Sequence, residues 1–173
     1  MKKYTILKWI VFGLAVAINL FIIINALING EASAQESNKV AHTTADIINE
    51  VKPETITKEN FPSFALTIRK LFGHYGLFVV SGLLSSWSFY LFLKDTKVGY
   101  FLYQIGFTLF FGFVIAAISE FAQMFVEGRY GTWKDVGIDF LGYFTGFSLI
   151  FLILLIRKSK IFWKKNYMKN QAE

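Results

Sequence analysis

The sequence predicts an all-α membrane protein with four transmembrane helices and a polar extracytoplasmic loop after the first. Of its 173 residues, 54% are hydrophobic and only 17% are charged, and the mean hydropathy is +0.46. A soluble chain of this length does not require so apolar a composition. Four apolar runs are long enough for a bilayer span, which takes roughly 20 helical residues. These runs are residues 9–28, 71–93, 98–126 and 136–156.

The runs divide the chain into four parts. We expect an N-terminal transmembrane anchor (1–28), an extracytoplasmic loop (29–70), a three-helix transmembrane domain (71–156) and a basic cytoplasmic tail (157–173). The first part also resembles a secretory signal that would be cleaved after Ala34. We favour a retained anchor, because its apolar run exceeds the roughly 7 to 15 residues of a signal core.

Basic residues orient the chain in the membrane. They concentrate beside the spans in three segments, which the positive-inside rule places in the cytoplasm together with both termini. Membrane topology therefore explains the net charge of +6, and we expect no nucleic-acid binding. The three segments contain Lys2, Lys3 and Lys8; Lys94 and Lys97; and Arg157, Lys158, Lys160, Lys164, Lys165 and Lys169.

The long loop is too polar to cross the membrane, because its acidic and basic residues are numerous and nearly balanced. Thr43 or Thr44 can cap a short helix that ends near Val51, where Pro53 stops it. Pro62 marks the entry to the second span. The sequence thus predicts one short helix within an otherwise irregular loop.

Ionisable and polar residues collect where the second, third and fourth spans approach the extracytoplasmic side. A charge at the centre of a spanning helix costs roughly 2.5 to 3.5 kcal/mol, so such residues usually face a protein interior or a wet cavity. We therefore predict an outward-facing polar pocket formed by the last three spans. Its candidate residues are Arg69, Lys70, His74, Glu120, Gln123, Arg129, Asp135 and Asp139.

Two glycines follow the acidic residues on the fourth span. Asp135, Asp139, Gly142 and Gly146 recur at helical spacing, so they share one face. Small residues four apart let a neighbouring helix approach closely. This pair is expected to seat the Asp139 carboxylate against the second or third span.

Common enzyme signatures are missing from the sequence. The chain has no cysteine, which excludes disulfides, thiolate metal sites and cysteine nucleophiles. It has no phosphate-binding glycine loop, dinucleotide fingerprint, Gly-x-Ser-x-Gly or His-Glu-x-x-His motif. We expect no cofactor.

These motifs, taken in order, resemble the VanZ-like family of small bacterial membrane proteins. The resemblance covers about residues 69–156 and implies a protein of the bacterial cytoplasmic membrane. The namesake is associated with resistance to glycopeptide antibiotics such as teicoplanin. Where the family commonly has Asn, this chain has Asp139, which adds a titratable charge. The matching residues are Arg69, Lys70 and His74 in IRKLFGHYGLF, Glu120 and Gln123, and Arg129, Asp135 and Gly142.

Several functions stay open at this point. The pocket can bind membrane lipids, lipid-linked cell-wall precursors or a lipoglycopeptide antibiotic, with Arg129 and Arg69 or Lys70 holding an anionic group. An intramembrane hydrolase or transferase would use His74, Glu120 and Asp139 as candidate catalytic residues. These residues and Asp135 also offer ligands for a divalent metal. A proton pathway, or plain helix packing through polar contacts, is a further alternative.

Overall fold

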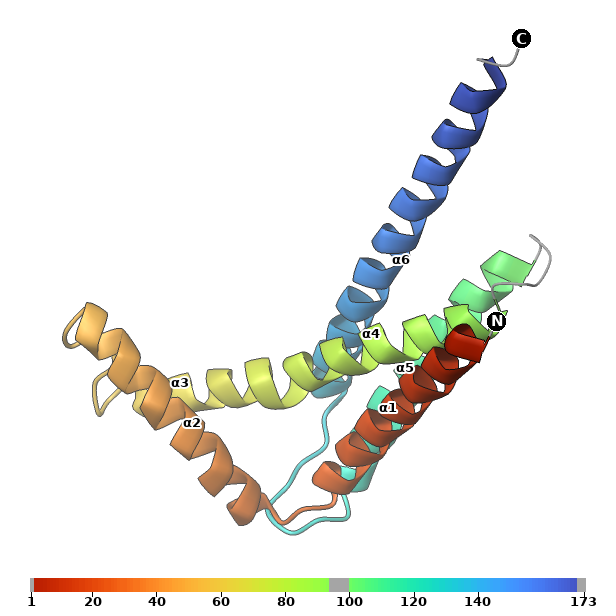
Figure 1. Cartoon of the computed structure of the whole chain (residues 1–173). Coiled ribbons are helices and arrows are strands. Elements are labelled where there is room, and N and C mark those ends of the chain that lie inside the picture. Colours follow the sequence, from red (N-terminus) through yellow and green to blue (C-terminus); the bar gives the residue numbers. More distant parts are fainter. Residues whose placement is uncertain (1, 94–99, 171–173) are drawn as a thin grey trace.

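The computed structural model describes residues 2–93 and 100–170, and these residues form helices and short connections without any strand (Figure 1). Four helical stretches are long and apolar enough to cross a membrane, which confirms the predicted all-α fold with four spans. The chain is therefore a multi-pass membrane protein. The elements are α1 (Lys2–Ala26), α2 (Gly30–Val51), α3 (Phe61–Ile68), η1 (Arg69–Gly76), α4 (Leu77–Leu93), α5 (Tyr100–Gln123) and α6 (Trp133–Asn170).

The four spans differ in length from the predicted runs. The second span is one continuous helical stretch, Phe61–Leu93, so it begins ten residues before the predicted position 71. The fourth belongs to α6, a long helix that continues into the basic tail. The predicted turn with Lys94 and Lys97 lies outside the described residues.

The segment after the first span is a long helix rather than a loop with one short helix, which corrects our expectation. Asn29 begins α2, since its side chain accepts a hydrogen bond from the backbone N–H of Glu31 at 2.8 Å. Thr43 and Thr44 do not cap a helix here, because their hydroxyls bond back to carbonyls one turn earlier within α2. The helix ends before Pro53, as predicted.

Helices α2 and α3 form a hairpin at the end of the bundle where α1 ends and α6 begins (Figure 1). Ala41 of α2 is fully buried against Ala65 and Ile68 of α3. Their connection is held by Asn49, whose side-chain amide accepts from the N–H and donates to the carbonyl of Ile56, both at 2.9 Å. The hairpin therefore has a small core of its own beside the transmembrane bundle.

Close packing of α6 against η1 and α4 confirms the role predicted for the two glycines. A Cβ atom on Gly142 would collide with the backbone carbonyl of Tyr75, and one on Gly146 with that of Val79. Tyr143 lies between these glycines and is fully buried. The two helices thus approach to backbone contact only because both positions lack a side chain.

Helix α1 joins the bundle through polar contacts in its middle. Asn19 donates to the hydroxyl of Ser85 at 3.1 Å and accepts from the hydroxyl of Ser81 at 2.8 Å. All three residues are buried, and interhelical hydrogen bonds of this kind hold transmembrane helices together. Asn19 is therefore a packing residue, as its position in an apolar run predicts.

Candidate functional site

The second span changes its helical geometry where the site lies. Residues Arg69–Gly76 form a π-helix, in which the backbone bonds from residue i to i+5. Arg69 and His74 are five residues apart, a spacing that would turn them about 140° from each other in an α-helix. The wider π turn brings both to the same side, and both line the same cavity.

His74 meets two carboxylates from two other helices. Its Nδ1 lies 3.1 Å from Oδ1 of Asp139 on α6 and 3.4 Å from Oε1 of Glu120 on α5. Glu120 is 3% exposed, and Asp139 is fully buried. The structure thus brings together the three candidate catalytic residues named from the sequence.

Each carboxylate is anchored by its second oxygen. Oε2 of Glu120 accepts from the backbone N–H of Thr132 at 3.1 Å, and Oδ2 of Asp139 accepts from the Ser119 hydroxyl at 3.4 Å. Oε1 of Glu120 also accepts from the side-chain amide of Gln123 at 3.0 Å. These bonds fix the carboxylates so that one oxygen of each faces His74.

Arg129 enters the site from the connection between α5 and α6. Its guanidinium donates to the carbonyl of Ala26 at the end of α1 and to the hydroxyl of Ser33 on α2. Burial lowers the pKa of Arg129 below its usual range, and the nearby positive charge of Arg69 lowers this pKa further. Arginine remains protonated despite such shifts, so Arg129 is a buried cation.

Arg129 is held in place by the fold of its own connection. Gly128 adopts a positive φ of 73°, which glycine tolerates without strain. The carbonyl of Glu127 accepts from the N–H of Gly30 at 3.1 Å, and a side chain on Gly30 would collide with Gly128. The connection between α5 and α6 is therefore held against the start of α2, which lies far from it in the sequence.

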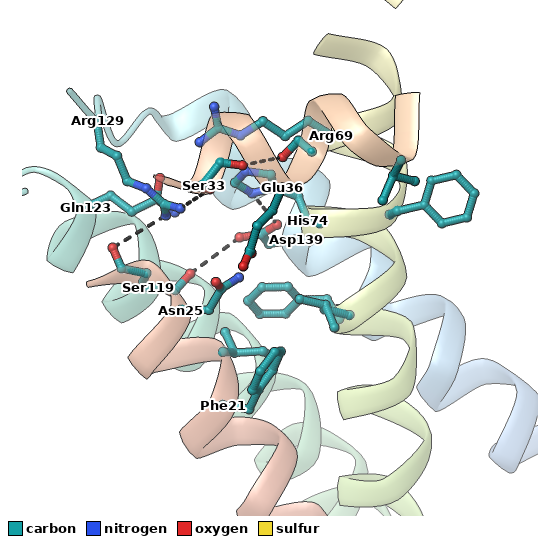
Figure 2. A pocket seen from close by; sticks show the side chains of 18 of the residues that line it. Phe21, Asn25, Ser33, Glu36, Arg69, His74, Ser119, Gln123, Arg129 and Asp139 are labelled. Atoms are coloured by element: carbon teal, nitrogen blue, oxygen red, sulfur yellow. Dashed lines mark hydrogen bonds and ion pairs between the residues drawn. The ribbon is translucent and has the colours of Figure 1, made fainter. Parts of the chain in front are cut away.

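A cavity of about 290 Å³ lies beside these groups. Figure 2 shows Arg69, Arg129 and His74 gathered at one end of it and Phe21 at the other. Its walls come from α1, α2, α3, η1, α4, α5, α6 and the connection between α5 and α6, which corrects the expectation that the last three spans form the pocket. The lining includes Phe21, Ile22, Asn25, Ser33, Glu36, Arg69, Phe72, His74, Leu77, Phe78, Ser119, Gln123, Arg129 and Asp139.

Sequence reasoning missed the contributions of α1 and α2. Asn25, a polar residue of the first span, lies in the wall of the cavity. A polar residue next to the end of an apolar span is a signal that could have located this part of the wall. Ser33 and Glu36 gave no such signal, because only the unforeseen helix α2 brings them to the cavity.

Three predicted site residues, Glu120, Lys70 and Asp135, are not part of the cavity lining. Glu120 contacts His74, which does line the cavity. Nζ of Lys70 contacts Oδ1 of Asp135 at 2.6 Å, and neither residue belongs to the lining. The Asp135 carboxylate also accepts from the hydroxyl of Thr132 at 2.9 Å. Lys70 and Asp135 thus connect η1 to the start of α6, while Arg69 lines the cavity.

The fold and the site define a class: a small helical membrane protein that encloses a polar cavity at one end of its bundle. A family model, VanZ/LLP1, matches residues 9–156, so the chain belongs to this family. Membership is consistent with a role in antibiotic resistance. No curated protein and no solved structure matches the chain.

Proposed function

We propose that this protein binds an amphiphile with an anionic headgroup, either a lipid-linked component of the cell envelope or an amphiphilic glycopeptide. The protein resides in the bacterial cytoplasmic membrane with both termini in the cytoplasm and its cavity facing outward. Binding there contributes to resistance of the teicoplanin type. The basic residues that flank the spans support this orientation.

The observation that carries the proposal is the state of Arg129. It is 8% exposed, and within the described residues no carboxylate lies within 4.0 Å of its guanidinium. Its Nε also lacks a hydrogen-bond partner there. A buried charge is costly unless it is paired, and Glu120 attracts Arg129 only from a longer distance. An anionic ligand supplies the missing partner.

Phosphate or carboxylate suits this environment. Arg69 lines the same end of the cavity and, like Arg129, has no carboxylate within ion-pair distance among the residues described. Guanidinium groups bind such anions in a bidentate manner, which adds both geometry and energy. Two guanidinium groups at one end of a cavity therefore favour an anionic headgroup over a neutral one.

The rest of the cavity suits an apolar chain. Phe21, Phe72 and Leu77 belong to its lining. Cavities for drug-sized ligands measure roughly 300 to 1,000 Å³, so about 290 Å³ holds a headgroup and the first part of a chain. The remainder of a long lipid would then extend along the helices into the bilayer. This division of polar and apolar surface is what supports an amphiphile.

Native mass spectrometry of the purified protein tests the proposal. The wild type is expected to carry an anionic amphiphile, and Arg129→Ala is expected to lose it. Lys134→Ala is the matched control, because Lys134 is an exposed cation five residues away that does not line the cavity. Equal retention by Arg129→Ala and the wild type would reject the proposal.

Hydrolysis or group transfer on a lipid or lipid-linked precursor is a second candidate function. It is favoured by the contact of His74 with Asp139, because a carboxylate that orients an imidazole is a usual arrangement for a general base. His74 and Asp139 both line the cavity that would hold the substrate.

Turnover of a radiolabelled lipid-linked precursor by the purified protein tests this second function. Asp139→Asn is expected to abolish turnover while an amphiphile still co-purifies, since Arg129 is unchanged. Absence of turnover by the wild type across a broad panel of such precursors would leave binding as the function.

A further inference from the structure

We propose that His74, Glu120 and Asp139 form a binding site for one divalent transition-metal ion. Each residue comes from a different element, η1, α5 and α6. One ligand atom from each lies within 4.8 Å of the other two. This inference does not rest on the proposed function, because it concerns the three residues alone and is tested without any amphiphile.

The distances agree with coordination of a single ion. Two ligand atoms that each lie about 2.1 Å from a metal are roughly 3.0 Å apart at a right angle and roughly 3.4 Å apart at a tetrahedral angle. Nδ1 of His74 lies 3.1 Å from Asp139 Oδ1 and 3.4 Å from Glu120 Oε1. Two of the three distances among the ligand atoms therefore match those around a single ion, and all three are within 4.8 Å.

The net charge of His74, Glu120 and Asp139 also favours binding of a cation. Two buried carboxylates face one imidazole, so with both carboxylates ionised the group is negative even when His74 is protonated. Lys70, the ammonium group closest in sequence to His74, contacts Asp135 instead, and Arg129 attracts Glu120 without forming an ion pair with it. An uncompensated negative charge in a buried site is strongly unfavourable. A divalent ion neutralises it, with His74 as a neutral ligand.

The outer contacts of the carboxylates are those of a preformed site. Ser119 and the backbone N–H of Thr132 each hold the oxygen that does not face His74. Partners of this kind orient metal ligands, and their loss typically weakens metal affinity by about 10-fold to 100-fold. The other oxygen of each carboxylate thereby faces the imidazole, and that of Glu120 also accepts a hydrogen bond from the side-chain amide of Gln123.

The three protein side chains favour a transition-metal ion and leave one of its coordination positions open. Imidazole suits zinc, iron and copper, whereas magnesium and calcium prefer oxygen ligands alone. Three protein ligands also leave a coordination position open, as in catalytic zinc sites. Since His74 and Asp139 line the cavity, the ion would lie beside it.

Zinc binding by the full-length protein in detergent, measured by equilibrium dialysis with Zn²⁺ alone, tests the proposal. The chain contains two histidines, which provide a matched pair of variants. We expect one Zn²⁺ per chain for the wild type and for His42→Ala, whose side chain stacks on Phe61 away from the site. We expect loss of the bound ion in His74→Ala. Retention of it by His74→Ala, or no stoichiometric binding by the wild type, would overturn the proposal.

Further variants separate ligation from a general loss of folding. Asp139→Asn keeps the size of the side chain, and it is expected to weaken Zn²⁺ affinity about 100-fold while the circular dichroism spectrum is unchanged. Ser119→Ala, which removes only an outer contact, is expected to weaken affinity about 10-fold. The absorption spectrum of bound Co²⁺ should then change in Ser119→Ala and stay unchanged in His42→Ala. Equal zinc affinity of wild type and Asp139→Asn would contradict the proposed ligand set.

Discussion

Nδ1 of His74 lies 3.1 Å from Oδ1 of Asp139, although 65 residues separate them in the chain. Two local features create this contact. The π-helix Arg69–Gly76 turns His74 toward the cavity, and Gly142 allows α6 to touch the backbone of Tyr75, the neighbour of His74. The site therefore depends on the close packing of α6 against the second span.

Gly142→Ala is expected to destabilise the protein. The added methyl group would collide with the backbone of Tyr75, and overpacking of a close contact typically costs about 1 to 3 kcal/mol. Gly137→Ala is the matched control on the same helix, because no atom lies within 4 Å of its added Cβ. Thermal unfolding in detergent measures both variants. Equal midpoints for the two variants would show that α6 does not pack as described.

Under the proposed function, Glu120→Gln is expected to abolish resistance to teicoplanin. The substitution removes the buried charge that faces His74 while keeping the shape of the side chain. Glu127→Gln serves as the control, since Glu127 is an exposed carboxylate beyond the end of α5. The minimum inhibitory concentration is measured in cells that produce each variant at equal levels. Resistance of Glu120→Gln equal to that of the wild type would show that the Glu120 carboxylate is not required for the proposed function.

Arg69→Ala and Lys70→Ala are expected to differ although they are adjacent. Arg69 lines the cavity, and the loss of a charge-assisted hydrogen bond of about 1.5 to 3 kcal/mol weakens binding about 10-fold to 100-fold. Lys70 contacts Asp135 outside the cavity and is 46% exposed, so its ion pair contributes at most about 1 kcal/mol to stability. The amount of co-purified amphiphile per chain distinguishes the two. A greater loss in Lys70→Ala would contradict the arrangement.

Single cysteines can establish the orientation in the membrane, because the chain has none of its own. Thr43→Cys places a thiol on the exposed side of α2, and Ser159→Cys places one on the exposed C-terminal part of α6. A membrane-impermeant maleimide is expected to label position 43 in intact cells and position 159 only after permeabilisation. The reverse labelling pattern would show that the protein has the opposite orientation in the membrane.

The four spans and the core of the site could be predicted from the sequence. Run length and hydropathy identify the spans, because a bilayer imposes a minimum length on an apolar helix. The cost of burying charges in a membrane predicts that His74, Glu120 and Asp139 face one another. In each case a strong physical constraint acts on residues that are visible in the sequence.

Helix α2 and the π-helix could not be predicted in the same way. The core of α2 consists of alanines such as Ala41 and Ala45, which give little hydrophobic pattern. Their high helix propensity was the available signal. The π-helix lies where η1 packs against α6, and no local pattern of Arg69–Gly76 reveals it. The contact of Arg129 with Ala26, 103 residues away, likewise exists only in the folded chain.

The most direct test of the account is a solid-state NMR measurement in lipid bilayers. It would record the dipolar coupling between the ¹⁵N-labelled imidazole of His74 and the ¹³C-labelled side-chain carboxyl of Asp139, with His42→Ala present to remove the other histidine. A Nδ1 to Oδ1 distance of 3.1 Å predicts a clear coupling, which Asp139→Asn abolishes because asparagine is unlabelled. Absence of that coupling in the otherwise unaltered protein would show that these residues do not meet.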